Sequence, residues 1–222
     1  MSDQTSPRRH TSASYSLIVR TETANQPGML ARVLTAIGEE GGNLGEIDLV
    51  AESEERRVRE IVVLARDEAH GHAIAERLTH RDGVHLASIV DRIFRAHEGG
   101  KIDVVSRAPV ATRADLSMVY TPGVGRVCMA TRGDPVPQWR YTSRANTVAV
   151  VTDGSAVLGL GNIGPAAAQP VMEGKCAIFK TFAGVNAFPI CLATQDPDQI
   201  VATVERIAPV FGGTNIEDIA AP

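Results

Sequence analysis

The sequence lacks a long apolar run, has few cysteines and carries no excess of positive charge. Because no apolar run approaches the roughly 18 residues of a transmembrane helix, nothing in the chain is expected to span a membrane. The formal net charge of −4 gives no electrostatic reason to expect nucleic acid or an anionic membrane surface as a partner. The three cysteines, Cys128, Cys176 and Cys191, are odd in number and widely spaced, which suits the reducing cytoplasm.

The N-terminus also lacks the features of a signal peptide. Arg8-Arg9 is not followed by an apolar stretch, so residues 1–14 are interpreted as a disordered tail. At 222 residues and 44% hydrophobic, the chain is long enough for two modest cores. The helix and strand patterns along it predict an α/β protein with two domains, residues 15–97 and residues 98–222.

Residues 15–97 contain apolar patterns typical of strands and helices in alternation. The predicted elements are a strand at 16–20, a helix with apolar residues at 30, 33, 34 and 37, strands at 44–51 and 58–65, a helix at 68–79 and a strand at 84–94. This β-α-β-β-α-β order predicts the ferredoxin-like split arrangement, in which two helices pack on one face of an antiparallel sheet. His70 and His72 with His80 might suggest a metal site, but residues two apart in a helix diverge. These histidines are therefore interpreted as part of a solvated helix face.

Two stretches of the second half place a titratable side chain among glycines, prolines and apolar residues. Residues 115–125 contain Tyr120, and residues 173–189 contain Lys175. Such surroundings can exclude water and perturb the pKa of a titratable group, so the pair suggests proton transfer. On spacing alone, the two could equally be a surface phenol and a solvated amine, and Lys180 competes with Lys175 as a base.

Eight landmarks occur in one order within residues 98–222. They are Gly100-Lys101-Ile102, Asp115-Leu116-Ser117, Tyr120-Thr121-Pro122-Gly123-Val124, Thr152-Asp153-Gly154, Leu158-Gly159-Leu160-Gly161-Asn162-Ile163-Gly164, Glu173-Gly174-Lys175, Phe182-Ala183-Gly184 and Asn215-Ile216-Glu217-Asp218. This segment resembles the N-terminal catalytic domain of the malic enzymes, which oxidatively decarboxylate malate to pyruvate and CO2. It matches the shorter bacterial-type branch, because Ser155-Ala156 follow Asp153-Gly154 where the longer eukaryotic-type enzymes carry an arginine.

The resemblance implies a role for four residues. Tyr120 corresponds to the family's general acid, Lys175 to its general base, and Glu217 with Asp218 to the first two ligands of its Mg²⁺ or Mn²⁺. The reaction needs such groups: a base for the C2 hydroxyl proton, a cation for the enolate left after decarboxylation, and an acid for C3. The family binds NAD or NADP in a later domain, so the chain is expected to be a fragment that is inactive alone.

Adjacent carboxylates raise a geometric question. Successive side chains on a regular strand point to opposite faces, so Glu217 and Asp218 reach one ion only where the strand ends or bends. Gly212-Gly213 before them and Pro222 after them make such an irregularity plausible. The alternative is that one carboxylate is a ligand or a helix cap and the other is solvated.

Gly159-Leu160-Gly161-Asn162-Ile163-Gly164 also matches the dinucleotide-binding pattern G-x-G-x-x-G. We reject that interpretation, because Asp153-Gly154 is a hairpin signal that predicts an antiparallel partner for the preceding strand. Pro165 and Pro170 are expected to interrupt the helix that the motif requires, and no acidic residue follows at the distance of a ribose ligand. The glycines are expected instead to allow close backbone approach beside the active site.

The turn and helix at residues 25–34 resemble the ACT family of small regulatory domains, whose first strand-to-helix loop binds an amino acid or similar effector at a subunit interface. The resemblance implies a homo-oligomer with Asn25 and Gly28 as effector-binding residues, although many ACT domains carry an aspartate at the position of Asn25. The alternative is an assembly role without a ligand. A non-catalytic regulatory module therefore remains the second hypothesis for the chain.

Overall fold

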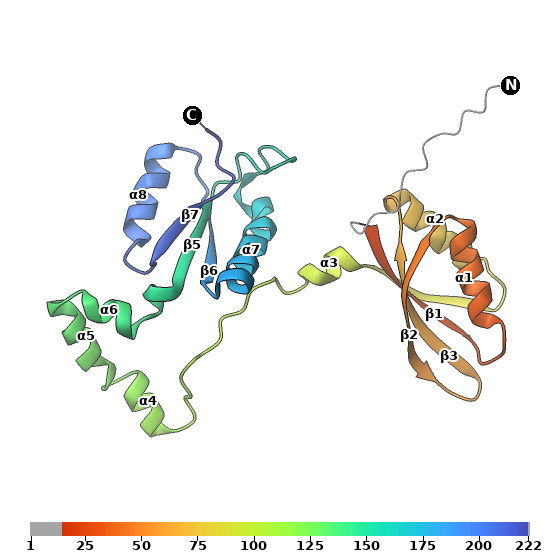
Figure 1. Cartoon of the computed structure of the whole chain (residues 1–222), viewed down its shortest axis with the longest axis horizontal. Coiled ribbons are helices and arrows are strands. Elements are labelled where there is room, and N and C mark those ends of the chain that lie inside the picture. The colour runs from red at the N-terminus through yellow and green to blue at the C-terminus, as the bar shows by residue number, and fades with distance from the viewer. Residues whose placement is uncertain (1–14, 222) are drawn as a thin grey trace. The chain divides into compact units, whose positions relative to one another are not determined.

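The computed structural model describes residues 15–221, so the predicted tail at residues 1–14 lies outside the described part of the chain. The chain divides into two compact units, Met1–Glu98 and Gly99–Pro222 (Figure 1). Among the described residues, no helix is long and apolar enough to cross a membrane.

The first unit is built on a four-stranded antiparallel sheet. Its elements are β1 (Ser16–Ala24), α1 (Met29–Glu39), β2 (Asn43–Glu52), β3 (Arg56–Leu64), α2 (Glu68–Thr79) and β4 (Val84–Asp91). The strand order is β2-β3-β1-β4, so the strands that are consecutive in sequence do not all pair. The predicted β-α-β-β-α-β arrangement is confirmed.

The last strand of this unit is shorter than predicted. A short helix, α3 (Arg92–His97), follows β4 directly, so the predicted extension of the strand to Phe94 is wrong. The side chain of Asp91 accepts hydrogen bonds from the backbone N–H groups of Ile93 (2.7 Å) and Phe94 (3.4 Å). A capped N-terminus of this kind favours a helix over continued strand.

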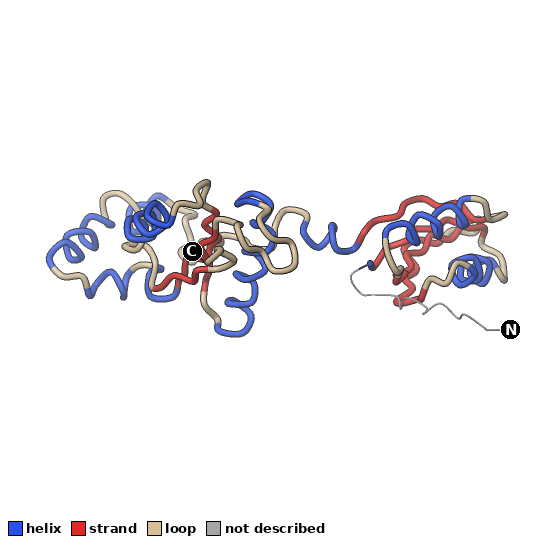
Figure 2. Tube along the Cα trace, turned by 90° about the horizontal axis from the view of Figure 1, so that it is seen from above, coloured by secondary structure: helices blue, strands red, loops and turns tan. Residues whose placement is uncertain are grey.

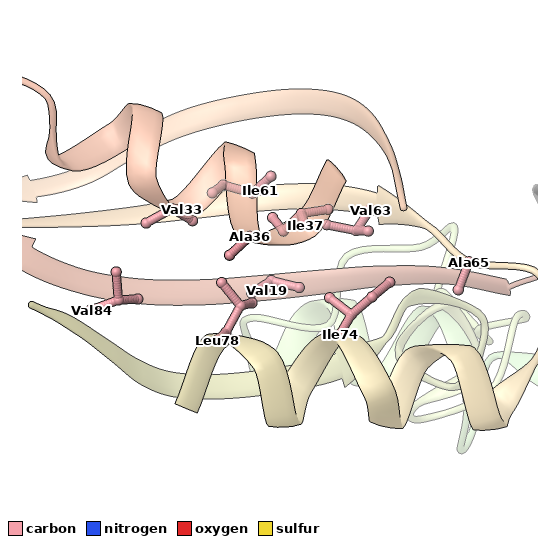
Figure 3. Packing of buried hydrophobic residues seen from close by; sticks show 10 residues of the cluster. All are labelled: Val19, Val33, Ala36, Ile37, Ile61, Val63, Ala65, Ile74, Leu78 and Val84. Carbon is pink, nitrogen blue, oxygen red and sulfur yellow. The ribbon is translucent and has the colours of Figure 1, made fainter. Parts of the chain in front are cut away.

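The core of the first unit lies between the sheet and its two long helices (Figure 3). On β1, Val19 faces this core, and on α1 the residues at helical spacing do so. Full burial of one such side chain contributes about 1.5–3 kcal/mol, which makes this cluster the main source of the unit's stability. Its members are Val19, Val33, Ala36, Ile37, Ile61, Val63, Ala65, Ile74, Leu78 and Val84.

His70 is buried, so its assignment to a solvated helix face is wrong. Its Nδ1 accepts a hydrogen bond from the backbone N–H of Arg66 (3.0 Å), and its Nε2 lies 2.8 Å from the carbonyl oxygen of Glu40 at the end of α1. The network therefore assigns the proton to Nε2. His72, two positions on, is exposed, which agrees with the divergence expected of such a pair.

The second unit holds a three-stranded parallel sheet ordered β6-β5-β7. Its elements are α4 (Arg113–Val119), α5 (Val124–Gly133), α6 (Val136–Tyr141), the 3-10 turn η2 (Ser143–Asn146), β5 (Thr147–Thr152), α7 (Gly164–Ala183), β6 (Asn186–Cys191), α8 (Pro197–Ile207) and β7 (Gly213–Ile216). Helices α7 and α8 flank the sheet on opposite sides (Figures 1 and 2). At the start of α8, the Asp196 side chain accepts a hydrogen bond from the N–H of Asp198, and Pro197 lies in the first turn.

Two predictions are wrong, one about the central strand β5 and one about the helix that follows it, α7. β5 pairs with parallel neighbours on both sides, so it is not half of an antiparallel hairpin. Helix α7 runs without a break across Pro165 and Pro170. Pro165 lies in the first turn, where its missing N–H has no helical partner to lose. Pro170 removes one internal hydrogen bond, but the buried Met172 and Cys176 pack α7 against β5, and this packing maintains the helix.

Candidate functional site

The carboxyl ends of the parallel strands define the region where a ligand is expected. From β5 the chain crosses through α7 to β6 on one side, and then through α8 to β7 on the other side. In open sheets with parallel strands, such a reversal of direction leaves a crevice outside the carboxyl ends of the strands. The segments that follow β5 and β7 carry the Asp153 and Glu217 landmarks, so both lie at this edge.

Lys175 and Glu217 meet at this edge. The Nζ of Lys175 on α7 lies 3.0 Å from Oε1 of Glu217, and the two side chains are 34% and 24% exposed. Glu217 follows β7 directly, and its backbone N–H donates to the carbonyl oxygen of Val151 on β5 (2.9 Å). The structure therefore brings together one residue expected to be the base and one expected to be a metal ligand.

Three influences set the charge of Glu217. Partial burial raises the pKa of this carboxyl, but hydrogen bonds from Asn215 and Lys175 and the positive charge of Lys175 outweigh burial and lower the pKa below its usual value. The Asn215 amide donates to Oε2 at 2.8 Å. Glu217 is therefore held as a carboxylate, the form that binds a cation.

Asp218 stands at a sharp bend of the backbone. Its φ of 52° lies in the left-handed region, and it is the one non-glycine residue with positive φ among the described residues. Its carbonyl oxygen accepts from the N–H of Ala156 (3.0 Å), which ties this bend to the segment after β5. The irregularity that the adjacent carboxylates need is therefore present, because β7 ends at Ile216 and the chain turns at Asp218.

The segment after β5 approaches α7 more closely than a side chain would allow. A Cβ at Gly154 would lie 2.2 Å from the carbonyl oxygen of Gly164 at the start of α7. By contrast, a Cβ at Gly159 or Gly161 would meet nothing within 4 Å, although both residues have positive φ. The expected close approach thus occurs at Gly154, and the glycines of the G-x-G-x-x-G motif serve backbone conformation instead.

Two landmarks far apart in sequence meet on α7. The carboxylate of Glu173 accepts a hydrogen bond from the backbone N–H of Lys101 (2.9 Å), and Lys101 Nζ donates to the carbonyl oxygen of Pro170 (2.6 Å). Glu173 therefore anchors the start of the second unit to the helix that carries Lys175.

Lys180 lies at the opposite end of the sheet. Its Nζ donates to Oδ1 of Asn186 (2.7 Å), and Asn186 pairs with Thr147 at the first position of both strands. Helix α7 runs back along the sheet, so its C-terminal part lies beside the amino ends of the strands. The geometry favours Lys175 over Lys180 as the lysine of the site.

Tyr120 is not brought to Lys175. It ends α4, its side chain is 65% exposed, and no hydrogen bond joins its hydroxyl to another of the described residues. Figures 1 and 2 both show α4 and α5 away from the three strands.

The start of α4 is fixed by a capping box between Thr112 and Asp115, and the hydrogen bonds from Thr112 lower the pKa of Asp115.

The predicted metal ligands fit a hard divalent cation in part. Glu217 and Asp218 carry carboxylate oxygens beside a backbone bend. The ion pair between Lys175 Nζ and Oε1 of Glu217 shows that this oxygen attracts positive charge. Within residues 15–221, no cluster of three or more His, Cys, Asp or Glu side chains is placed to hold a metal ion. Two carboxylates alone would fill only part of the coordination shell of such a cation.

The sequence reasoning missed Asn215, which appeared there only as part of a landmark. It also missed the paired amides of Asn162 and Gln195, which exchange hydrogen bonds of 3.3 Å and 3.1 Å and join the loops before α7 and α8. The spacing of Asn215 from Glu217 was the available signal, because residues two apart on a strand face the same way.

The predicted effector residues lie in the first unit. Gly28 has a φ of 85° and precedes α1, and no side chain caps that helix. The Asn25 amide donates to the carbonyl oxygen of Ser53 (2.8 Å), so it holds the connection between β2 and β3. The structure thus gives Asn25 a structural contact with the β2–β3 connection.

Residues 99–222 match the family model of the malic enzyme N-terminal domain. The chain belongs to the malic enzyme family. It is 49% identical to the NAD-dependent malic enzyme of Geobacillus stearothermophilus over 210 residues, covering 95% of this chain and 44% of that protein. It is 45% identical to NAD-dependent malic enzyme 1 of Bacillus subtilis over 202 residues, covering 90% of this chain and 46% of that protein.

A solved structure shares the fold of this malic enzyme segment. The NAD-dependent malic enzyme of Thermotoga maritima aligns with a TM-score of 0.58 and 51% identity, covering 60% of this chain and 38% of that one. The chain thus spans less than half the length of the two curated relatives.

Proposed function

We propose that this chain provides part of the active site of an enzyme that oxidatively decarboxylates malate to pyruvate and CO2, using NAD or NADP and Mg²⁺ or Mn²⁺. The contact between Lys175 Nζ and Glu217 Oε1 at 3.0 Å carries the proposal. It joins the expected base to an expected metal ligand at the carboxyl edge of a parallel sheet, where such sites occur.

The residues divide the work of this reaction. Lys175 would accept the proton of the C2 hydroxyl, and Tyr120 would deliver a proton to C3 after CO2 leaves. Glu217 and Asp218 would hold the divalent cation, which supplies stabilisation of the negative charge that develops on the substrate oxygen. The left-handed backbone at Asp218, with a φ of 52°, supports a shared site, because it would turn this side chain away from the regular alternation of the strand.

The base is tested in the full-length gene product by Lys175→Ala, with Lys180→Ala as the matched control. We expect the rate of malate oxidation to fall about 10²-fold or more in the first variant. The absorbance of the reduced nicotinamide measures this rate. The second should keep the wild-type rate, because Lys180 contacts Asn186 at the other end of the sheet. Equal rates in both variants would remove Lys175 from the mechanism.

The acid is tested by Tyr120→Phe, with Tyr141→Phe on α6 as its control, since that phenol is also exposed (57%). We expect pyruvate formation to slow about 10²-fold in the first variant alone. Wild-type pyruvate formation by Tyr120→Phe protein would contradict the assignment.

We further propose that the protein is a homo-oligomer. Helices α4, α5 and α6 contain no buried residue, and Met118 and Met129 are 67% and 63% exposed. Helices this short gain most of their stability from packing, so a second copy of the chain is the expected cover. Because Tyr120 follows α4 directly, the same contact would bring this phenol to a neighbouring site. Light scattering should report a mass above that of one chain, reduced by Met118→Glu with Met129→Glu.

We also propose that residues 15–97 form an ACT-like regulatory domain. Every residue of β2 is exposed, and β2 is an edge strand whose outer backbone groups pair with no other strand among residues 15–221. This observation supports assembly as a second role beside effector binding near Asn25 and Gly28. Titration calorimetry with a panel of amino acids and acyl-coenzyme metabolites separates the two roles. If none of these compounds gives a heat of binding, only the assembly role is left.

The cytoplasmic location is a proposal that rests on the three cysteines, which are all free thiols.

A further inference from the structure

Both oxygens of the Glu217 carboxylate are engaged, by partners of different kinds. Oε1 lies 3.0 Å from the Lys175 ammonium, and Oε2 accepts a hydrogen bond of 2.8 Å from the Asn215 amide. The lysine contact comes from a long side chain on another element. The asparagine contact comes from a short side chain on β7, two residues before Glu217.

The position of Asn215 is fixed by the sheet. β7 pairs with the central strand β5, and in that register Asn215 lies opposite Val150, which is fully buried. Residues 215 and 217 are two apart, so their side chains leave the strand edge on the same face. A half-buried amide in this place can hold one oxygen of Glu217 in a constant orientation.

We propose that Asn215 is a positioning residue for the proposed metal ligand Glu217: its amide holds Oε2 and so fixes the orientation in which the carboxylate meets the cation, while Oε1 stays on the side of the Lys175 ammonium. The inference rests on the proposed function, because it requires Glu217 to be a metal ligand. It assigns no contact with substrate or metal to Asn215 itself.

An amide suits this role better than a charged donor would. A lysine or arginine at position 215 would cancel the negative charge that attracts the cation, whereas an amide donates a hydrogen bond and stays neutral. An aspartate would set two like charges side by side and offer no donor. Residues that orient metal ligands in this way typically change metal affinity by about 10-fold to 100-fold when they are replaced.

The test is Mn²⁺ binding to the full-length gene product. The electron paramagnetic resonance signal of free Mn²⁺ measures this binding. Asn215→Leu keeps a similar shape and removes the donor, so we expect the Kd for Mn²⁺ to rise about 10-fold or more. Asn215→Gln retains an amide and should recover part of the affinity. Thr214→Val is the matched control, because Thr214 is exposed and faces away from Glu217 on the strand.

A purely structural role would give a different pattern. If Asn215 only stabilised β7, Asn215→Leu would lower the unfolding temperature and kcat while the Kd for Mn²⁺ of the folded protein stayed constant. The positioning role predicts the reverse: a higher Mn²⁺ concentration for half-maximal activity, with kcat at saturating Mn²⁺ within about twofold of wild type. Asn215→Ala carries the same expectations if the leucine variant does not fold.

Glu217→Gln distinguishes the ligand role of Glu217 from the positioning role of Asn215. Loss of Mn²⁺ binding in Glu217→Gln together with wild-type affinity in Asn215→Leu and Asn215→Ala would overturn the positioning role and leave Glu217 a ligand. Wild-type Mn²⁺ affinity in Glu217→Gln would overturn both the ligand assignment and the role of Asn215. Loss in Glu217→Gln with weakened binding in Asn215→Leu supports the inference.

Discussion

At the scale of single residues, the site is decided by where a side chain lies along its helix. Lys175 and Lys180 are five positions apart on α7, and the sequence pattern alone gave no ground for choosing between them. Residue 175 reaches the carboxyl edge of the sheet and pairs with Glu217, whereas residue 180 bonds to Asn186 at the amino edge. That difference depends on how α7 packs against β5, which local patterns do not encode.

The lowered pKa of Glu217 gives a pH dependence whose sign is fixed. A group with a depressed folded pKa stabilises the fold above its unfolded pKa, and the contribution is lost as the pH falls through the folded pKa. We expect the wild-type chain to exceed Glu217→Gln in free energy of unfolding by about 0.5–1 kcal/mol near neutrality, since the pair is partly exposed. Urea titrations at a series of pH values should show the two proteins converging in acid.

The exposed Glu205 on α8 provides the control for this measurement. Glu205→Gln removes the same charge without breaking an ion pair to any described residue, so its difference from wild type should not follow that pattern. A Glu217→Gln difference that persists unchanged into acid would contradict the electrostatic account.

At the scale of elements, the turn after β5 shows what a local signal can predict. Asp153-Gly154 indicated a hairpin turn, and Gly154 has a φ of 69°, the left-handed conformation that such turns require. The turn leads into the loop before α7 instead of a returning strand. Whether β5 pairs parallel or antiparallel depends on β6 and β7, whose contacts are distant in sequence, so the hairpin signal could not decide it.

At this turn, the cost of steric crowding by a new Cβ can be separated from the cost of a positive φ at a residue other than glycine. Alanine at Gly154 would place its Cβ 2.2 Å from a backbone oxygen of α7, at a φ of 69°. Alanine at Gly161 has a similar φ of 73° but meets nothing within 4 Å. We expect Gly161→Ala to cost about 1 kcal/mol from conformation alone, and Gly154→Ala to cost at least about 2 kcal/mol more.

Urea midpoints of the two variants measure this difference directly. Equal losses would mean that α7 can move away from residue 154 at little cost, and that the close packing of turn and helix is not important for stability.

The first unit was more predictable than the second, for physical reasons. Its strands and helices are set by period-2 and period-3.6 patterns of apolar residues within short segments, and its antiparallel pairs follow from that order. The second unit depends on a parallel sheet formed across long connections and on helices α4–α6 without buried residues. Tyr120 directly follows one of these helices, α4, so its distance from Lys175 could not be inferred from spacing.

At the scale of the whole molecule, the two units have separate cores. The cluster around Val19 and Ile74 belongs to the first unit, and the cluster of Val150, Met172 and Cys176 belongs to the second. The pKa of the Cys176 thiol is raised to about 11, chiefly by burial, which marks that second cluster as a water-poor interior. Distant sites without shared partners respond independently to mutation, so a change in one core should leave the other unaffected.

His70 provides the test of this independence. It joins the end of α1 to the start of α2 through hydrogen bonds of 3.0 Å and 2.8 Å, so His70→Ala leaves two backbone groups unpaired and should cost about 2 kcal/mol. In a unit of this size, that loss lowers the unfolding temperature by roughly 10 °C. Scanning calorimetry should resolve two transitions, of which only the one assigned to the first unit moves. His72→Ala, at an exposed side chain on the same helix, should move neither, and a single transition shifted as a whole by His70→Ala would show that the two cores unfold together.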